Sequence, residues 1–143
     1  MKIELRLNGK VIPATLADNR TAQEFVAMLP LTITMHDLFG REKFGALPLP
    51  VSAKGKRTRA YAIGDIVCWA PGPDVAIFYR HDGQTISGAL HLLGRIDVGV
   101  EAFSEPGPLQ VTIETAAERP RAGGDDPRRQ QPSRSASAPM SRA

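Results

Sequence analysis

Apolar segments in the second half of the chain, broken at short intervals by glycine and proline, most strongly constrain the fold. Residues 66–70 are apolar, Pro71 and Gly72 form a corner, and residues 75–79 are apolar again. A later segment, residues 93–96, is broken by Gly94. Short apolar runs bounded by turn residues are typical of strands. This succession predicts the wall of a β-barrel.

The rest of the chain adds further strands and one helix. Residues 1–7 and 109–115 alternate between apolar and polar residues, which predicts strands with one buried face. Thr21 and Glu24 have the spacing of a helix capping box, and Pro30 ends the helix. Further strands are predicted at residues 11–16, 31–36, 42–44, 59–62, 66–70, 75–79 and 91–97, with a tight turn at Asn8-Gly9.

Many short strands and a single short helix predict a closed or nearly closed barrel, because closure removes exposed strand edges. One apolar stripe on the helix has to be buried, and we expect the helix to cover an open end of the barrel. Apolar strands such as residues 66–69 leave open which of their faces points inward.

Charge divides the chain into two parts. Residues 1–116 carry 12 Lys and Arg against 12 Asp and Glu, whereas residues 117–143 carry 6 against 3, so the net charge of +3 comes from the C-terminal part. A neutral body argues against sequence-independent binding of nucleic acid, which depends on neutralising phosphates. Residues 117–143 are rich in Arg, Pro and Ser and have no aromatic residue. We therefore predict one domain, residues 1–116, and a disordered tail, residues 117–143.

The numbers and positions of the cysteines and histidines limit which disulfides and metal sites the chain can form. The single cysteine, Cys68, excludes an intramolecular disulfide and fits a reducing compartment, and its apolar surroundings predict an inert buried thiol. The three histidines are scattered, and no glycine-rich phosphate loop precedes a helix, so no metal and no cofactor are predicted. The N-terminus lacks the pattern of a signal peptide, and no apolar run approaches the ~20 residues that cross a bilayer. We expect a cytoplasmic protein that does not bind membranes.

The order of short motifs resembles that of a bacterial and archaeal family of cyclophilin-like proteins. The resemblance spans roughly residues 3–116 and rests on Asp18-Asn19, Thr21-Ala22, Phe25, residues 29–32, 37–40, 42–43, 47–48, 64–66, 69–72, 76–79 and 93–96. It implies a closed eight-stranded cyclophilin-like β-barrel with one short helix at an open end.

The resemblance implies a fold more readily than it implies an activity. True cyclophilins isomerise prolyl peptide bonds with the arginine of a Phe-His-Arg motif, and this chain has no such motif. His36 falls at roughly that place, but Met35 precedes it and Asp37 follows it. The nearest arginine is Arg41. A fold by itself does not determine function.

Several side chains are candidates for a ligand site. Thr32, Thr34 and His36 share one face of a predicted strand, which is either a polar patch in a cleft or a solvent-facing side. Trp69, Phe78 and Tyr79 can line a groove or belong to the core. Glu42 and Lys43 are expected to form an exposed ion pair.

We therefore predict a binding module for a peptide or small-molecule ligand, with a groove around Trp69, Phe78, Tyr79 and the strand that carries Thr32, Thr34 and His36. The alternative is a weak peptidyl-prolyl isomerase in which Arg41 or Arg59 replaces the missing arginine. A third possibility is nucleic-acid association through the tail. The oligomeric state is left open.

Overall fold

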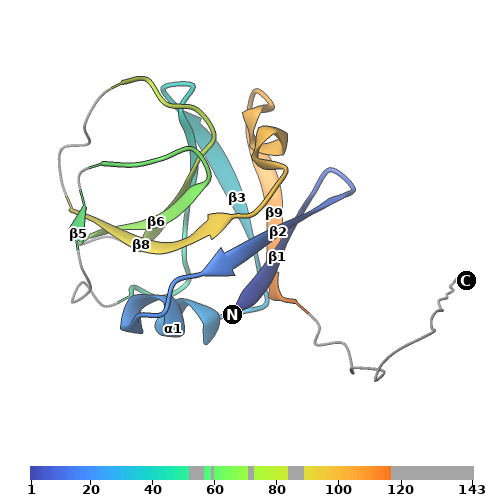
Figure 1. Ribbon diagram of the computed structural model, residues 1–143. Helices are drawn as coiled ribbons and strands as arrows, with labels where there is room; N and C mark the ends of the chain where they lie inside the picture. Colours follow the sequence, from blue (N-terminus) through green and yellow to red (C-terminus); the bar gives the residue numbers. More distant parts are fainter. Residues whose placement is uncertain (52–56, 59, 71–72, 84–88, 117–143) are drawn as a thin grey trace, which may run out of the picture.

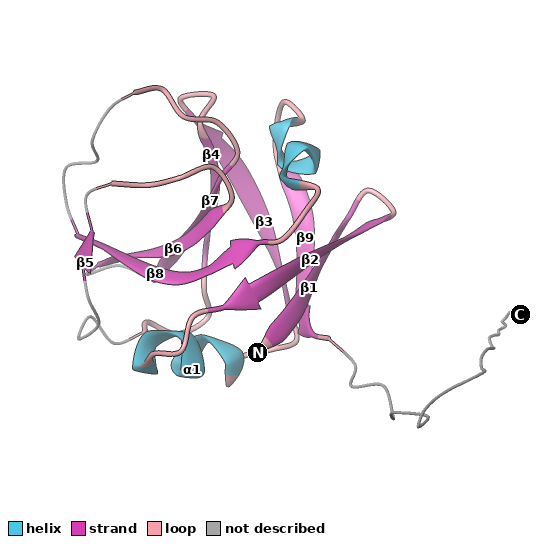
Figure 2. Cartoon of the chain, viewed as in Figure 1, coloured by secondary structure: helices cyan, strands magenta, loops and turns pink. Residues whose placement is uncertain are grey.

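The computed structural model describes residues 1–51, 57–58, 60–70, 73–83 and 89–116. The predicted tail, residues 117–143, lies outside the described residues. Strands make up most of the fold (Figure 2). In chain order the elements are β1 (Lys2–Leu7), β2 (Lys10–Leu16), α1 (Arg20–Val26), β3 (Leu31–Leu38), β4 (Glu42–Ala46), β5 (Arg57–Thr58), β6 (Asp65–Ala70), β7 (Asp74–Phe78), β8 (Ala89–Ile96), the 3-10 helix η1 (Val100–Ser104) and β9 (Leu109–Thr115).

Eight of the strands form a closed antiparallel barrel, as the sequence predicted. The strands follow one another around the barrel in the order β2, β1, β9, β3, β4, β7, β6 and β8, and a pairing between β2 and β8 closes the ring (Figure 2). The ninth strand, β5, pairs with residues 90–91 of β8, while β2 pairs with residues 94–96 of the same strand. The edge of β8 is therefore divided between two partners.

Gly94 allows the backbones of β2 and β8 to approach each other at the closing pairing. A Cβ atom at this position would lie 2.4 Å from the carbonyl oxygen of Thr15 and 2.9 Å from the Cα of Leu16. Both are backbone atoms, which a change of rotamer cannot move. The glycine that breaks the apolar pattern in the sequence is thus required where the barrel closes.

The interior is filled by alternate residues of the strands. Leu109, Val111 and Ile113 of β9 are buried, as the alternation predicted, and so are Ile3 and Leu5 of β1. On β6, Ile66 and Cys68 belong to this inner cluster, whereas Val67 belongs to another. The faces of β6 that the sequence left open are thereby assigned.

A second apolar cluster covers the opposite face of β4, β6, β7 and β8. Its buried members are Tyr61, Val67, Ala76, Phe78 and Leu90, and Phe44, Trp69 and Leu92 pack against it. Both faces of these strands are covered, because the barrel interior lies on one side and this outer cluster on the other. We call this side of the barrel the outer face.

Helix α1 lies across one end of the barrel (Figure 1) and buries Ala22 and Phe25. Its N-cap is Asn19, whose Oδ1 accepts a hydrogen bond of 2.7 Å from the backbone N–H of Ala22. The capping box predicted at Thr21 is wrong, since Thr21 is 1% exposed and lies inside the helix. Asparagine is as good an N-cap as threonine. With Asn19 as the N-cap, the helix begins two residues earlier than a cap at Thr21 would place it.

The strand predicted at residues 59–62 is also misplaced, because the short strand in this region is Arg57–Thr58. Arg59 lies outside the described residues. The N–H of Ala62 donates to Oδ2 of Asp65 at 2.8 Å, which forms a side-chain turn in place of a sheet pairing. Among the residues described, no helix is long and apolar enough to span a membrane.

We predict that Gly94→Ala destabilises the barrel by about 2–3 kcal/mol, because the added methyl group meets backbone of β2. Urea unfolding followed by the fluorescence of Trp69, the single tryptophan, measures this. Gln110→Ala, at an exposed position of β9, is the control and should change stability by about 0.5 kcal/mol or less. Equal unfolding midpoints for the two variants would show that the seam tolerates a Cβ.

Candidate ligand-binding site

The predicted polar strand face is exposed to solvent. Thr32, Thr34 and His36 all lie on the outside of β3, and the Thr32 hydroxyl is 2.8 Å from that of Thr112 on β9. The His36 ring centre lies 6.2 Å from that of Phe44, which packs against the outer cluster. His36 thus lies at the margin of the outer face, and the two threonines continue along β3.

The predicted aromatic residues divide between the two faces of the sheet. Phe78 is buried in the outer cluster and Trp69 packs against the same cluster. Tyr79 packs against the inner core, and its hydroxyl donates to Asp37. Burial, together with this carboxylate, raises the pKa of Tyr79 to about 12. The structure therefore brings Trp69 and Phe78 together and separates Tyr79 from them.

Arg41 is buried and held by carboxylates. Its Nε donates to Oε1 of Glu42 at 2.9 Å, Nη2 contacts the same oxygen, and Nη1 lies 3.5 Å from Oδ2 of Asp82. The guanidinium carbon also lies 5.7 Å from the ring centres of Tyr61 and Phe78. All three nitrogens of Arg41 are thus directed to groups within the protein.

The exposed ion pair expected between Glu42 and Lys43 is wrong, because both side chains are buried. Neighbouring residues of a strand point to opposite faces, so the two charges have separate partners. Lys43 donates to the carbonyl oxygens of Glu105 and Gly107 at 2.6 and 2.7 Å. Burial raises the pKa of Glu42 although Arg41 opposes the shift, and its Oε2 has no hydrogen-bond partner among the described residues.

Tyr61 fixes the segment that crosses the outer face before β6. Its ring is stacked between those of Phe78 and His81, with 4.2 Å between ring centres on each side. Its hydroxyl donates to Oδ1 of Asp82 at 2.7 Å and accepts from the backbone N–H of Asp82 at 3.1 Å. Burial raises the pKa of Tyr61, so the hydroxyl keeps its proton at neutral pH.

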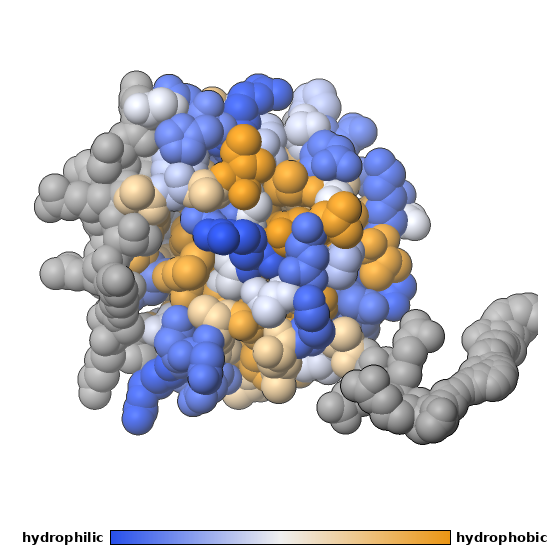
Figure 3. Space-filling model, viewed as in Figure 1, coloured by the Kyte–Doolittle hydropathy of each residue, from blue (hydrophilic) through white to orange (hydrophobic). Residues whose placement is uncertain are grey.

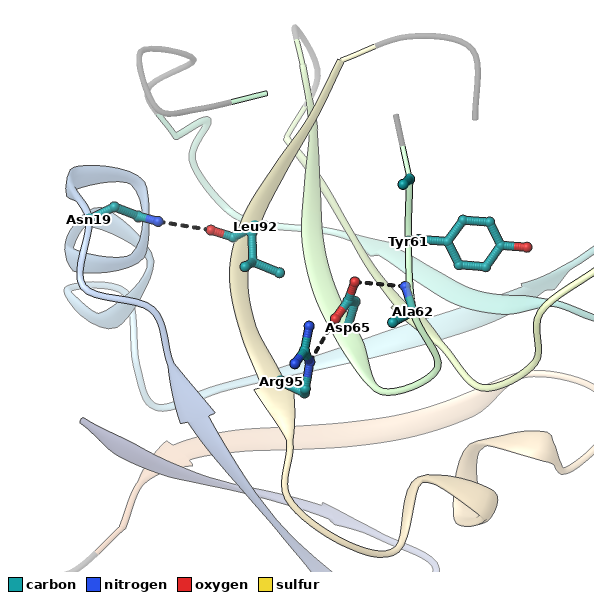
Figure 4. A pocket seen from close by; sticks show the side chains of 7 residues that line it. Asn19, Tyr61, Ala62, Asp65, Leu92 and Arg95 are labelled. Carbon is teal, nitrogen blue, oxygen red and sulfur yellow. Dashed lines mark hydrogen bonds and ion pairs between the residues drawn. The ribbon is translucent and has the colours of Figure 1, made fainter. Parts of the chain in front are cut away.

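A pocket of about 480 Å³ lies beside Tyr61 on the outer face. It is lined by Asn19, Ala60, Tyr61, Ala62, Asp65, Leu92 and Arg95 (Figure 4). Figure 3 shows one side of the molecule, where apolar side chains are exposed across the middle between hydrophilic ones. The volume is within the range of about 300–1,000 Å³ that is typical of small-ligand sites.

The pocket forms where the edge of β8 passes from one partner strand to the other. Among the described residues, β5 pairs with Leu90 and His91 and β2 pairs with residues 94–96, and residues 92–93 have no described strand partner on this edge. The carbonyl of Leu92 accepts from Nδ2 of Asn19 at 3.0 Å, and that of Leu93 accepts from the N–H of Ala17 at 2.7 Å. The segment between β2 and α1 thereby provides hydrogen-bond donors for these two carbonyls of β8.

Asp65 and Arg95 supply the charge of the pocket. Asp65 is 6% exposed, and its Oδ1 accepts a hydrogen bond of 2.9 Å from Nε of Arg95. Its Oδ2 accepts from the N–H of Ala62. The Arg95 side chain is 61% exposed, so the ion pair has a buried carboxylate and an accessible guanidinium.

Sequence reasoning did not select the residues of this pocket as site residues. A signal was present, since Asn19, Asp65 and Arg95 lie within the short motifs that carry the resemblance to cyclophilin-like proteins. Asp65 and Arg95 are opposite each other in the β6–β8 pairing, although 30 positions separate them in the chain. Their meeting depends on register, which a single sequence does not show.

The remaining candidates for chemistry lie apart from one another. In the described part of the chain, no group of three or more His, Cys, Asp or Glu side chains is placed to hold a metal ion. Cys68 is buried in the inner core, as expected. Burial, with a smaller contribution from the Asp74 carboxylate, raises the pKa of its thiol to about 11.

Comparison with known proteins supports the assignment of the fold. A model described as the cyclophilin-like family matches residues 5–114. The chain is also similar to the solution structure of a hypothetical protein from Archaeoglobus fulgidus, with a TM-score of 0.67 and 18% identity. That match covers 81% of this chain and 95% of the other, and at this identity it shows the fold alone. No curated protein matches the chain.

We predict that Arg41→Met destabilises the protein by about 3 kcal/mol, because it leaves the buried Glu42 carboxylate without its cation. Urea unfolding measures the loss. Arg6→Met is the matched control, since Arg6 forms an ion pair with Glu114 but is 52% exposed, and it should cost under about 1 kcal/mol. Similar losses in the two variants would argue against a structural role for the buried pair.

We also predict that Cys68 resists alkylation in the folded protein. Raising the pKa of a thiol from 9.0 to about 11 lowers its thiolate fraction about 100-fold at pH 8, and burial excludes the reagent as well. Iodoacetamide labelling followed by mass spectrometry tests this, with the chain unfolded in urea as the control. Equal labelling rates for the folded and unfolded chain would contradict the prediction.

Proposed function

The chain belongs to the cyclophilin-like family, and we propose that it is a noncatalytic binding module that holds a peptide or small-molecule ligand on the outer face of its barrel. The observation that carries the proposal is the pocket beside Tyr61. Binding sites are typically preformed, largely apolar concavities with a few placed polar groups. Leu92, Ala60 and Ala62 supply apolar wall, and Arg95 supplies an accessible polar group.

The rigidity of the pocket supports binding. Tyr61 is held by ring contacts on both faces and by two hydrogen bonds to Asp82. Asp65 ties the wall at Ala62 to Arg95, and Asn19 ties the start of α1 to β8. Walls fixed in this way need little ordering when a ligand enters, which favours affinity.

The prolyl-isomerase alternative has less support. Such a reaction needs a hydrogen-bond donor placed at the reacting amide. Arg41, the arginine closest to His36 in sequence, is 7% exposed and directs its nitrogens to Glu42 and Asp82. Binding without turnover fits these contacts better.

The single buried cysteine, Cys68, fits the reducing cytoplasm as the place where the module acts.

A ¹⁵N-labelled full-length protein titrated with a library of small fragments and short Xaa-Pro peptides tests the proposal. We expect ligands to shift the amide signals of residues 60–65 and 92–95. Ala62→Phe fills the pocket and should abolish these shifts, whereas Ala46→Phe, at an exposed position of β4, should leave them unchanged. Ligands that shift only other faces of the barrel would contradict the proposed site.

The same peptides test the absence of turnover. We expect the interconversion of cis and trans Xaa-Pro bonds, followed by NMR exchange spectroscopy, to proceed at the uncatalysed rate in the presence of the protein. A faster rate that survives purification and disappears on unfolding would identify an enzyme and would contradict the noncatalytic part of the proposal.

A further inference from the structure

We infer that the pocket on the outer face selects ligands with a carboxylate or phosphate group attached to a compact apolar body, and that the terminal guanidinium nitrogens of Arg95 bind the anionic group. This inference rests on the proposed function, which it narrows to a chemical class of ligand. It follows from which polar groups of the pocket are already used and which are accessible.

Most polar groups of the pocket are engaged within the protein. Oδ1 of Asn19 caps α1 and its Nδ2 donates to the carbonyl of Leu92. Both oxygens of Asp65 accept hydrogen bonds, from Ala62 and from Arg95. The hydroxyl of Tyr61 exchanges two hydrogen bonds with Asp82. These groups shape the pocket, and a ligand has to find its polar partner elsewhere.

Arg95 is that partner, because Asp65 engages its guanidinium on one side only. The hydrogen bond to Asp65 uses Nε, and the structure gives the two Nη groups no hydrogen-bond partner among the described residues. Figure 4 shows the guanidinium beside Asp65 and within the ring of lining residues. The two Nη groups form a fork that matches the two oxygens of a carboxylate or phosphate.

The negative charge of Asp65 does not cancel this preference. Asp65 is buried behind Arg95, whereas the Arg95 side chain is 61% exposed. A ligand group at the outer edge of the guanidinium is therefore closer to the positive charge than to the carboxylate. The energy of two charges falls with distance, so the nearer cation dominates. Asp65 acts as a positioning residue that orients Arg95.

The other walls determine the rest of the ligand. Leu92, Ala60 and Ala62 are apolar, and both faces of the Tyr61 ring are already covered by Phe78 and His81. In Figure 4 the Tyr61 ring points away from Leu92 and Arg95, so the apolar walls come from the other three residues. A small aromatic or branched aliphatic body fits such walls, with its anionic group directed to Arg95.

Three probes of similar size test the inference: benzoate, phenyl phosphate and benzamide. Each is titrated into the ¹⁵N-labelled full-length protein at constant ionic strength, and affinities are taken from the shifts of residues 60–65 and 92–95. We expect at least one anion to bind about fivefold tighter than neutral benzamide, since hydrogen bonds to charged groups are the stronger ones. Comparing benzoate with phenyl phosphate distinguishes the carboxylate from the phosphate.

Two arginine variants separate the role of Arg95 from that of charge in general. In Arg95→Gln the preference should vanish, with the anions weakened about fivefold and benzamide unchanged. Arg6→Gln removes the same charge from the exposed pair on β1 and should leave all three affinities as in the wild type. Arg95→Lys keeps the charge without the fork and should bind the anions with intermediate affinity.

The outcomes separate this inference from the proposed function. Equal affinities for the three probes in the wild type overturn the inference and leave the binding module standing. An equal loss of anion affinity in Arg95→Gln and Arg6→Gln also overturns it, because the effect would come from net charge. If neither these probes nor any library fragment or peptide shifts the pocket residues, the proposed function fails with it.

Discussion

The backbone contact between β2 and β8 closes the barrel, and the other features of the molecule depend on it. Only three residue pairs join the two strands, and at Gly94 an added Cβ atom would meet the backbone of β2. Without this seam, the eight strands would have two open edges and the inner core would lose one wall. The pocket lies next to this seam, since Leu92 and Arg95 of β8 line it on either side of Gly94.

Burial on both faces of the sheet determines how the polar residues of β4 behave. The inner core lies on one side of β4, β6, β7 and β8, and the outer cluster on the other. Glu42 and Lys43 therefore have no exposed side to occupy, and each buried charge is stabilised by its own partners. Arg41 takes part in this pairing and does not line the pocket, where Arg95 is the accessible arginine.

None of the predicted site residues lines the pocket, although two of them lie on the same outer face of the barrel. Trp69 and Phe78 do meet on the outer face, because residues two apart or at paired positions of neighbouring strands share a side of the sheet. Tyr79 follows Phe78 directly and therefore lies on the opposite side. The sequence analysis did not pair Asp65 with Arg95. Each is a charged residue next to a glycine, and only the register of β6 and β8 places the two together.

Local patterns in the sequence were sufficient for the eight strands of the barrel, the turn at Asn8-Gly9 and the helix before Pro30, but not for β5. Alternation determined the inward residues of β9, where one face is apolar and the other polar. Where both faces are apolar, as in residues 66–69, alternation carries no information, and only packing decided that Ile66 and Cys68 point inward. The pocket was likewise decided by the tertiary structure. It depends on how β6 and β2 pair with β8, and such long-range register follows from barrel closure and is not encoded in any one segment.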